Sequence, residues 1–434
     1  MDQTLPRLYK DYGEYSNYRN FPLDLDGLKP VERRVLLSAY KIARAKYVKS
    51  RQVDSYTTGH YHPHGECYGT IVQLVRQGFL IGQGNFGSNV GVEPTGPAAP
   101  RYTECKIDPR TLELAFKYIK YCPEVPTELG DKEPVFLPTM IPICLLGNDY
   151  TQGIGFGYKT FIPCFSYTSL KNRLMWLLGH RKTEPVPVPN SDCTVTASPS
   201  DLKKLLTTGK NKIDVEGIIE ENPKLNKVIL KSWPPGKRFE TILNKFSAEL
   251  DSGMIGFTDL SSFETEIVFQ VLRERSRDKI YQDFVAKLKD VIKGTISFET
   301  TVVDSNRKVV VKSVDDLLLD TYKMFAGMNE TMLNEEVRRT DDQIAEYNLL
   351  DIVRPVLASC IKDGFDMEMT FTFIKDAIEK IDLDAVKELV NKYKISKLLT
   401  LDTDTQELVD KKQQFTQTLA ELDKFLVEQY SMFK

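Results

Sequence analysis

Residues 30–46 read PVERRVLLSAYKIARAK, and this stretch decides how the first part of the chain is expected to fold. Proline suits the first position of a helix, and Glu32 suits its positive N-terminal end. At about 100° per residue the apolar side chains share one face, formed by Val31, Val35, Ala39 and Ile42. The basic side chains share a neighbouring arc, formed by Arg33, Arg34, Lys41 and Arg44. The stretch therefore predicts an amphipathic helix whose basic arc either faces water or meets a polyanion.

A second helix is expected over residues 66–77, after the histidine-rich turn GHYHPHG at residues 59–65. Its apolar side chains Ile71, Leu74 and Val75 point inward. Two short helices joined by a turn, the first of them basic, predict a helix-turn-helix element. Residues 78–100 contain six glycines, three prolines and one charge, so a loop is expected there, and residues 101–107 alternate like a strand.

Charge is distributed unevenly along the 434 residues, although the net charge is only −3. Residues 314–434 hold 15 Lys and Arg against 25 Asp and Glu, a net charge of −10, so residues 1–313 carry +7. Residues 27–51 hold one acid and eight bases, which are Lys29, Arg33, Arg34, Lys41, Arg44, Lys46, Lys49 and Arg51. A field of that density attracts polyanions such as nucleic acid.

The seven cysteines are scattered, with no CxxC pair and no zinc-type spacing, which indicates free thiols in a reducing compartment. The N-terminus has no apolar signal-peptide core. The longest uncharged run, residues 134–148, contains two internal prolines and is shorter than the ~20 residues of a spanning helix. We therefore expect a cytoplasmic protein of roughly two to four domains that makes no membrane contact.

Three histidines, His60, His62 and His64, lie within GHYHPHG. Alternating histidines suggest a metal site, but Pro63 bends the segment and no fourth ligand stands at a suitable spacing. Contact with phosphate, or general acid and base work by His62 or His64 beside a basic helix, is the functional interpretation. Polar residues of a turn are the structural alternative.

Tyr102 follows Arg101 in the motif RYTE. A phenol has a pKa near ~10 and is a weak nucleophile at neutral pH, so a reactive tyrosine needs a positive charge nearby. Arg101 can supply that charge and stabilise a phosphoryl group during its transfer, although an Arg-Tyr pair also arises by chance among 20 tyrosines.

Residues 82–88, GQGNFGS, lack the lysine and hydroxyl of a P-loop, and no acidic pair follows a convincing strand. Neither a nucleotide site nor a self-contained magnesium nuclease is expected.

Residues 166–313 alternate between strand-like and helical segments, which predicts an α+β region without a catalytic constellation. Residues 314–434 are acidic and helical, with one long helix expected from residue 315 to about residue 357. Near the end, apolar residues recur at spacings of 7, 4, 3 and 4, in a seam formed by Leu408, Phe415, Leu419, Leu422 and Leu426. Two long helices around a small helical insert predict an antiparallel coiled-coil arm, which is either internal or dimerising.

Six motifs, in this order, resemble the DNA breakage-reunion subunit of type IIA topoisomerases, the family of gyrase A, topoisomerase IV A and the bacteriophage topoisomerase medium subunit. They are DGLKPVERRVL (26–36), YHPHGE (61–66), GQGNFGS (82–88), RYTE (101–104), LPTMIP (137–142) and GIGFG (153–157). The resemblance implies an α+β multidomain fold. Its parts are an N-terminal arm (1–26), a winged-helix DNA-gate domain with a helix-turn-helix (27–165), an α/β tower (166–313) and a coiled-coil arm with a helical C-gate (314–434).

By this resemblance Tyr102 is the nucleophile that forms a transient 5′-phosphotyrosyl link in each DNA strand, and Arg101 is its catalytic arginine. His62 and His64 match histidines near the scissile phosphate. Arg33 matches a DNA-contacting arginine, and Ile154 matches an isoleucine that wedges between base pairs and bends the duplex. The remaining DNA-binding residues are expected in the same basic stretch, namely Lys29, Arg34, Lys41 and Lys46.

The resemblance also implies partners. The chain is expected to form a homodimer on double-stranded DNA, and a heterotetramer with a partner subunit that holds the ATPase and the magnesium site. This chain itself is then expected to bind neither metal nor ATP. Relaxation or decatenation is expected rather than supercoiling, because a DNA-wrapping domain is missing from the sequence. The compact length is similar to bacteriophage-type subunits, which would place the protein in the cytoplasm of a bacterial host.

Departures from the family pattern keep other interpretations open. Pro100 precedes Arg101 where the family has a small or unbranched residue, which suits a DNA-bending scaffold without catalytic activity. A helix-turn-helix regulator with a coiled-coil dimer arm would explain the basic helix but not RYTE. Cys67 and Gly69 are the nearest equivalents of the serine and the acid that anchor quinolones in gyrase, so the sequence does not predict quinolone sensitivity.

Overall fold

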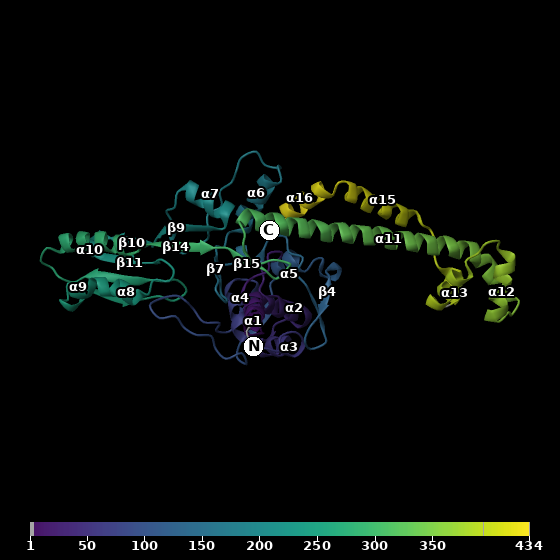
Figure 1. Cartoon of the computed structure of the whole chain (residues 1–434), viewed down its shortest axis with the longest axis horizontal. Helices are drawn as coiled ribbons and strands as arrows, with labels where there is room; N and C mark the ends of the chain where they lie inside the picture. The colour runs from purple at the N-terminus through teal and green to yellow at the C-terminus, as the bar shows by residue number, and fades with distance from the viewer. Residues whose placement is uncertain (1–3, 394, 434) are drawn as a thin grey trace. The chain divides into compact units, whose positions relative to one another are not determined.

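The computed structural model describes residues 4–393 and 395–433. It is a mixed α/β chain with several small sheets, as Figure 1 shows, and this confirms the expected combination of helices and strands. The chain divides into two compact units. The first runs to Phe325 and includes the segment from Tyr430, and the second is Ala326–Gln429. Within the described ranges, every helix is too short or too polar to cross a bilayer.

The first unit begins with helices around the basic stretch. They are α1 (Thr4–Asn20), α2 (Pro30–Ile42), α3 (Ser50–His60), α4 (Tyr68–Arg76) and α5 (Pro109–Ala115). The helices predicted over residues 30–46 and 66–77 are confirmed as the shorter α2 and α4. Glu32 begins α2 by accepting the backbone amide of Lys29 at 2.9 Å, and Val35 and Leu36 are fully buried on its inner face.

The prediction that GHYHPHG follows directly on the helix of residues 30–46 is wrong, because α3 lies between them and the turn joins α3 to α4. The buried face of α3 is largely polar. The Thr57 hydroxyl donates to the Ser38 hydroxyl at 2.9 Å, and Asp54 accepts the Cys67 amide at 2.7 Å. Because hydrogen bonds replace apolar packing on this face, hydrophobic periodicity carries no sign of the helix.

A small antiparallel sheet accompanies these helices, in the order β1 (Val48–Lys49), β3 (Glu104–Ile107) and β2 (Leu80–Gln83). Cys105 in the central strand lies opposite Val48 on one side and Gly82 on the other. The strand β3 confirms the alternation seen after Arg101, whereas β2 lies in the segment expected to be a loop. A side chain at Gly82 would approach the ring of Phe86 to 2.5 Å, so close packing accounts for this glycine.

Two larger sheets follow in the first unit. One has the order β6 (Thr151–Ile154), β7 (Lys159–Ile162), β14 (Lys293–Glu299), β9 (Lys210–Glu216) and β8 (Thr194–Val195), accompanied by α6 (Tyr167–Leu177) and α7 (Pro199–Thr208). The other has the order β10 (Ile219–Asn222), β11 (Lys227–Leu230), β13 (Ile267–Val271) and β12 (Ile255–Asp259), with α8 (Phe239–Leu243), α9 (Ser247–Asp251) and α10 (Arg277–Val291). The second sheet has its own core, centred on Phe246, Phe269 and Phe284. The alternation predicted for residues 166–313 is confirmed.

Short elements complete the first unit. The strand β4 (Glu124–Pro126) pairs with β5 (Lys132–Pro134), and β15 (Thr301–Val303) pairs with β16 (Val309–Val311). Single 3-10 turns form η1 (Ile119–Tyr121), η2 (Ile143–Leu145), η3 (Pro223–Leu225) and η4 (Asn244–Phe246).

The second unit is helical. It holds most of α11 (Val314–Lys362), then α12 (Met367–Ala377), α13 (Leu383–Lys392), α14 (Ile395–Thr400), α15 (Gln406–Ala420) and much of α16 (Leu422–Met432). The long helix expected from residue 315 is confirmed as α11. Lys412 of α15 pairs with Asp341 of α11 at 2.6 Å, so these helices lie side by side, as Figure 1 also shows. A break at Glu421 separates α15 from α16, so the seam from Leu408 to Leu426 does not run along one continuous helix.

Candidate active site

Tyr102 is strongly exposed, with 64% of its surface accessible, and it lies just before β3. The guanidinium carbon of Arg101 lies 4.5 Å from the centroid of the Tyr102 ring. A cation over the ring face interacts favourably with the aromatic quadrupole and brings positive charge close to the phenol. The expected proximity of Arg101 and Tyr102 is therefore present in the free chain, and the phenol is open to a large substrate.

The backbone around Tyr102 is held by hydrogen bonds, although its side chain is exposed. The Tyr102 amide donates to the Ala99 carbonyl at 2.8 Å, which closes a turn with Pro100 at its second position. Proline favours that position because its fixed φ matches the turn, so Pro100 fits the local geometry. The Ser50 amide at the start of α3 donates to the Thr103 carbonyl at 2.9 Å. The start of α3 is thus linked by a hydrogen bond to the residue that follows Tyr102.

The long connection before Tyr102 extends to the β10–β13 sheet. Ser88 and Thr95 pair across it through backbone hydrogen bonds of 3.0 and 2.8 Å. At its tip the Val92 amide donates to Asp259 Oδ2 at 2.9 Å, and the Val92 side chain packs against the core of that sheet. The segment that leads to Tyr102 is therefore anchored on a separate sheet, which sequence motifs alone did not indicate.

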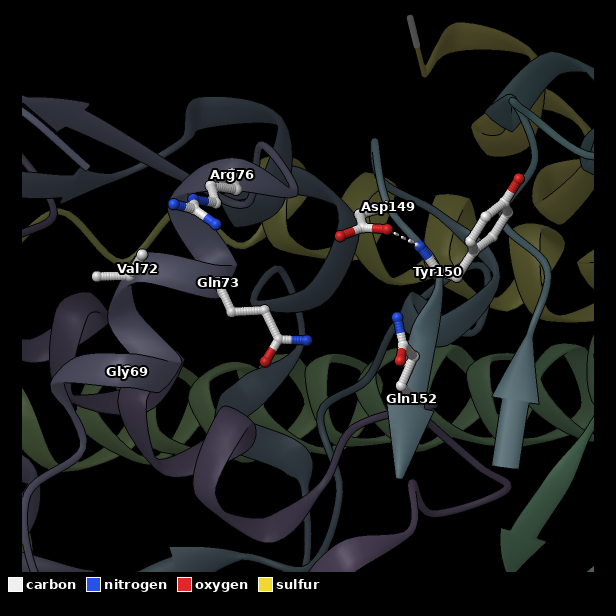
Figure 2. A pocket seen from close by; sticks show the side chains of 7 residues that line it. All are labelled: Gly69, Val72, Gln73, Arg76, Asp149, Tyr150 and Gln152. Atoms are coloured by element: carbon white, nitrogen blue, oxygen red, sulfur yellow. Dashed lines mark hydrogen bonds between the residues drawn. The ribbon is translucent and has the colours of Figure 1, made fainter. Parts of the chain in front are cut away.

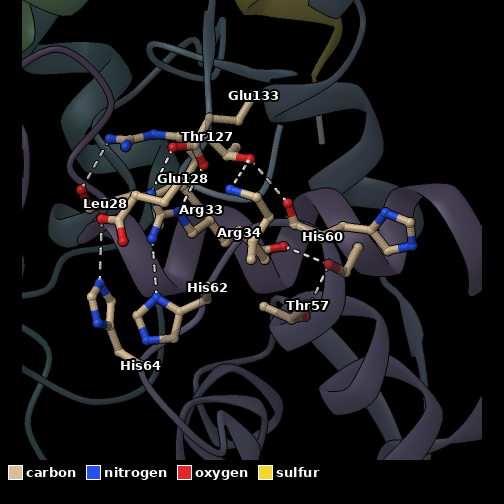
Figure 3. Close-up of polar contacts among 12 residues, drawn as sticks. Leu28, Arg33, Arg34, Thr57, His60, His62, His64, Thr127, Glu128 and Glu133 are labelled. Atoms are coloured by element: carbon tan, nitrogen blue, oxygen red, sulfur yellow. Dashed lines mark hydrogen bonds and ion pairs between the residues drawn. The ribbon is translucent and has the colours of Figure 1, made fainter. Parts of the chain in front are cut away.

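His62 is buried beside Arg34, as Figure 3 shows. An Arg34 N–H group donates to His62 Nδ1 at 3.1 Å, while two further bonds of 2.7 Å join Arg34 to Glu133. Burial lowers the pKa of His62 to about 4, and the nearby charges of Arg34, His64 and Arg19 act in the same direction. A neutral His62 that accepts at Nδ1 carries its proton on Nε2. This nitrogen is then a hydrogen-bond donor that adds no charge.

His64 lies beside His62, with ring centroids 5.1 Å apart. Its Nε2 pairs with the Tyr15 hydroxyl of α1 at 2.9 Å, and Glu128 lies 3.7 Å away. His60 pairs separately with Asp131 at 3.0 Å. Across residues 4–393 and 395–433, no three His, Cys, Asp or Glu side chains gather as a possible metal site.

The basic stretch is less exposed than the helical arc suggests. Arg33 was expected on a solvated or DNA-facing arc, but it is 5% exposed and forms a buried pair with Asp26. Arg34 is occupied by Glu133 and His62, and the Lys29 ammonium donates to the Gln152 carbonyl. Lys41 and Lys46 are exposed. A helical wheel gives the direction of a side chain but not the carboxylates that come from distant segments, and this explains the error for Arg33 and Arg34.

Ile154 lies at the tip of the β6–β7 hairpin and is 82% exposed. It borders a groove of about 1880 Å³ whose lining also includes Lys159, Trp233 and Phe263. A smaller cavity of about 170 Å³ lies between α4 and the start of β6, and Figure 2 shows its lining. These residues are Gly69, Val72, Gln73, Arg76, Asp149, Tyr150 and Gln152. An exposed isoleucine beside a wide groove is suited to contact with a large partner.

The predicted site residues form two groups in the free chain. Arg101 and Tyr102 form one, and His62 and His64 form the other; among the described residues no hydrogen bond or ring contact joins the groups. Sequence reasoning missed the contribution of α1, which brings Tyr15 and Arg19 to the histidines. The two tyrosines and the arginine of YSNYR are a visible signal, but they match no motif on their own.

An exposed Arg-Tyr pair, an exposed hairpin isoleucine and a long helical unit agree with the class of type IIA topoisomerase A subunits. The family model for the A subunits of DNA gyrase and topoisomerase IV matches residues 19–434, and the chain belongs to this family.

Relatives agree with this assignment. The DNA gyrase A protein of Haemophilus influenzae is 31% identical over 293 residues, which cover 61% of this chain and 32% of that protein. The DNA topoisomerase 4 A protein of the same organism is 26% identical over 404 residues, covering 79% of this chain and 53% of that protein. The DNA gyrase A protein of Neisseria gonorrhoeae is 34% identical over 207 residues, covering 42% of this chain and 22% of that protein. The matches span about half or less of the length of these relatives.

Proposed function

We propose that this chain is the DNA-cleaving and religating subunit of an ATP-dependent type IIA topoisomerase. The observation that carries the proposal is Tyr102, whose phenol is exposed while its backbone is fixed and whose ring lies under Arg101. A nucleophile for duplex DNA must stand out from the protein surface and yet keep its position, because misplacement by even about 1 Å slows a reaction strongly.

The proposed reaction is a reversible transesterification. The Tyr102 oxygen bonds to a backbone phosphorus, the bond from phosphorus to the 3′ oxygen breaks, and the proton lost by the phenol is balanced by one gained at the 3′ oxygen. Arg101 stabilises the negative charge on the phosphoryl oxygens during transfer. Neutral His62 donates a hydrogen bond from Nε2 to a phosphate oxygen. His64 contacts the same phosphate once this group replaces the Tyr15 hydroxyl as the partner of His64. The 5′-phosphotyrosyl bond retains the energy needed for resealing.

The architecture suits this chemistry. We infer that α2–α4 with the β1–β3–β2 sheet form a winged-helix DNA gate, that the β10–β13 region forms a tower, and that α11 with α15 forms a coiled-coil arm. Two copies of the chain would cut the two strands, so that a second duplex passes through the break. Lys29, Arg33, Arg34, Lys41 and Lys46 remain predicted DNA-binding residues, of which the exposed Lys41 and Lys46 are available without rearrangement.

A partner subunit is part of the proposal. By family resemblance, the ATPase and the magnesium site belong to that partner. We expect relaxation or decatenation as the activity of the complete assembly.

The experiment mixes the chain with its partner subunit, magnesium, ATP and supercoiled DNA, then adds detergent and protease. Wild type should yield protein-linked double-strand breaks, and Tyr102→Phe should yield none. Tyr12→Phe is a matched control because Tyr12 is also exposed, at 63%, but lies on α1. Absence of linked breaks with wild type, or their persistence in Tyr102→Phe, would overturn the proposal.

The same experiment separates the alternatives. A DNA-bending scaffold without catalytic activity would bind and bend DNA but form no linkage. Its main support in the sequence was Pro100, and this residue occupies a favoured turn position that leaves Tyr102 exposed. A helix-turn-helix regulator would need neither Tyr102 nor the partner subunit for its effect.

A further inference from the structure

Asn17 is a buried polar residue on α1, with 5% of its surface exposed. Its Oδ1 accepts the backbone amide of Phe156 at 2.6 Å, and its Nδ2 donates to the carbonyl of the same residue at 3.3 Å. One side chain thus pairs both backbone polar groups of Phe156. This residue lies two positions after Ile154, at the turn of the β6–β7 hairpin.

The hairpin turn is pressed closely against α1. A Cβ atom at Gly155 would lie 2.2 Å from Asn17 Oδ1 and 2.4 Å from the Phe21 ring. A Cβ atom at Gly153 would lie 2.4 Å from the Asn20 carbonyl oxygen. The two glycines allow the hairpin to lie this close to the helix, and a larger residue at either position would clash with α1 or Phe21.

Aromatic packing adds a second contact between α1 and the hairpin. The rings of Tyr9 and Phe156 meet edge to face with centroids 4.9 Å apart. Tyr9 is itself 62% exposed, so it lies at the rim of the contact and Asn17 lies at its centre. The hairpin strands are only four residues each, and their tip therefore depends on α1 for a fixed position.

We propose that Asn17 is a positioning residue for Ile154, and that α1 sets the angle at which this isoleucine enters the DNA duplex. The inference rests on the proposed function, in which Ile154 separates two base pairs. Unstacking a base step costs a few kcal/mol. The Ile154 side chain must therefore keep its position against the base pairs that it separates. Asn17 holds it there because its two hydrogen bonds fix the backbone beside the wedge.

Through Tyr15, the same helix holds His64 at 2.9 Å. Tyr15 and Asn17 therefore connect His64 and the Ile154 hairpin to the same helix, and in the proposed function this helix fixes the wedge relative to the histidines that face the phosphate. A wedge that shifts relative to α1 would also shift the bent DNA relative to His62 and His64.

The test uses the full-length chain and a short duplex labelled at both ends for energy transfer, with fluorescence anisotropy for affinity. Asn17→Ala should lose roughly half or more of the bending signal, as should Ile154→Ala, while affinity changes less than about threefold because phosphate contacts supply most of it. Combining the two changes should reduce bending no further than Ile154→Ala alone, since both act on one wedge. Glu14→Gln is the matched control, because Glu14 is exposed on the same helix.

The outcomes are distinguishable. Normal bending by Asn17→Ala, with bending lost in Ile154→Ala, overturns this inference and leaves the proposed function standing. Normal bending by Ile154→Ala overturns the wedge and this inference together, whereas DNA cleavage by Tyr102 is judged by its own experiment. Additive losses in the double variant would indicate a general structural role and would also overturn the inference. If Asn17→Ala does not fold, Tyr9→Ala removes the exposed ring contact and should lower the bending signal in the same direction.

Discussion

Arg33 and Asp26 form a buried ion pair in which two hydrogen bonds, of 2.7 and 2.9 Å, join the guanidinium to the carboxylate. Asp26 also accepts the Leu137 amide at 2.9 Å, so the pair ties the start of α2 to a segment more than a hundred residues later. The most internal arginine of the basic stretch therefore holds two distant segments of the first unit together. The exposed Lys41 and Lys46 are basic residues of this stretch that a polyanion can reach without rearrangement.

Arg33→Ala should lower the free energy of unfolding by about 3–5 kcal/mol, because it leaves the Asp26 carboxylate buried without a countercharge. The measurement is urea denaturation of the full chain followed by circular dichroism. Lys41→Ala is the control and should change stability by no more than about 0.5 kcal/mol, since Lys41 is exposed. Equal effects of the two variants would contradict the structural role of the pair.

Replacing both Lys41 and Lys46 with alanine should weaken DNA binding and flatten its salt dependence. Each lost phosphate contact reduces the slope of log affinity against log salt by about 0.9, so the double variant should lose up to about 2. Lys323→Ala serves as the control, because this lysine is 75% exposed but lies on α11. An unchanged slope in the double variant would remove this surface from the DNA interface.

Acidification should destabilise the fold through His62. Its pKa is about 4 in the folded chain against an ordinary value of 6.5, so the unfolded chain binds more protons between these values. The free energy of unfolding therefore falls as the pH drops from about 6.5 to about 4. His62→Asn keeps an acceptor for Arg34 but does not titrate, and should reduce the fall. Urea unfolding midpoints at several pH values measure this loss of stability. Identical pH profiles of wild type and variant would contradict the burial of a neutral His62.

Apolar periodicity predicted the elements that bury apolar faces. It identified α2 and α4, the mixture of strands and helices in residues 166–313, and the long α11. It missed α3, because that helix meets its neighbours through Asp54 and Thr57 rather than through apolar side chains. It also missed β2, because Gly82, which allows close packing there, looks like a loop residue in the sequence.

The candidate residues could be selected from the sequence, but their environments could not. The adjacency of Arg101 and Tyr102 is visible in the chain, whereas the exposure of the phenol depends on a turn closed from Ala99. The partner of Arg34 is Glu133, about a hundred positions away, and no local pattern reveals such a pair. The support that Asn17 gives to the Ile154 hairpin likewise arises from segments 139 positions apart.

Asp259→Ala should loosen the segment that leads to Tyr102. Burial opposes ionisation of Asp259, but hydrogen bonds from Ser261 and from the Val92 amide outweigh it and hold its pKa below the usual value. Removing the carboxylate leaves the Val92 amide without its acceptor at the tip of the connection. Amide hydrogen exchange at Val92 should become faster, and the rate of DNA cleavage should fall on the order of tenfold through poorer positioning of the nucleophile.

Glu93→Gln is the matched control for this prediction, because Glu93 is an exposed acid in the same tip. It should leave both exchange at Val92 and cleavage unchanged. Faster exchange with normal cleavage in Asp259→Ala would show that the anchor holds the tip without affecting Tyr102. Slower cleavage with unchanged exchange would place the effect of Asp259 elsewhere in the β10–β13 sheet. Only the joint change supports a mechanical link from Asp259 through Val92 to the tyrosine, because the two observables report the two ends of that connection.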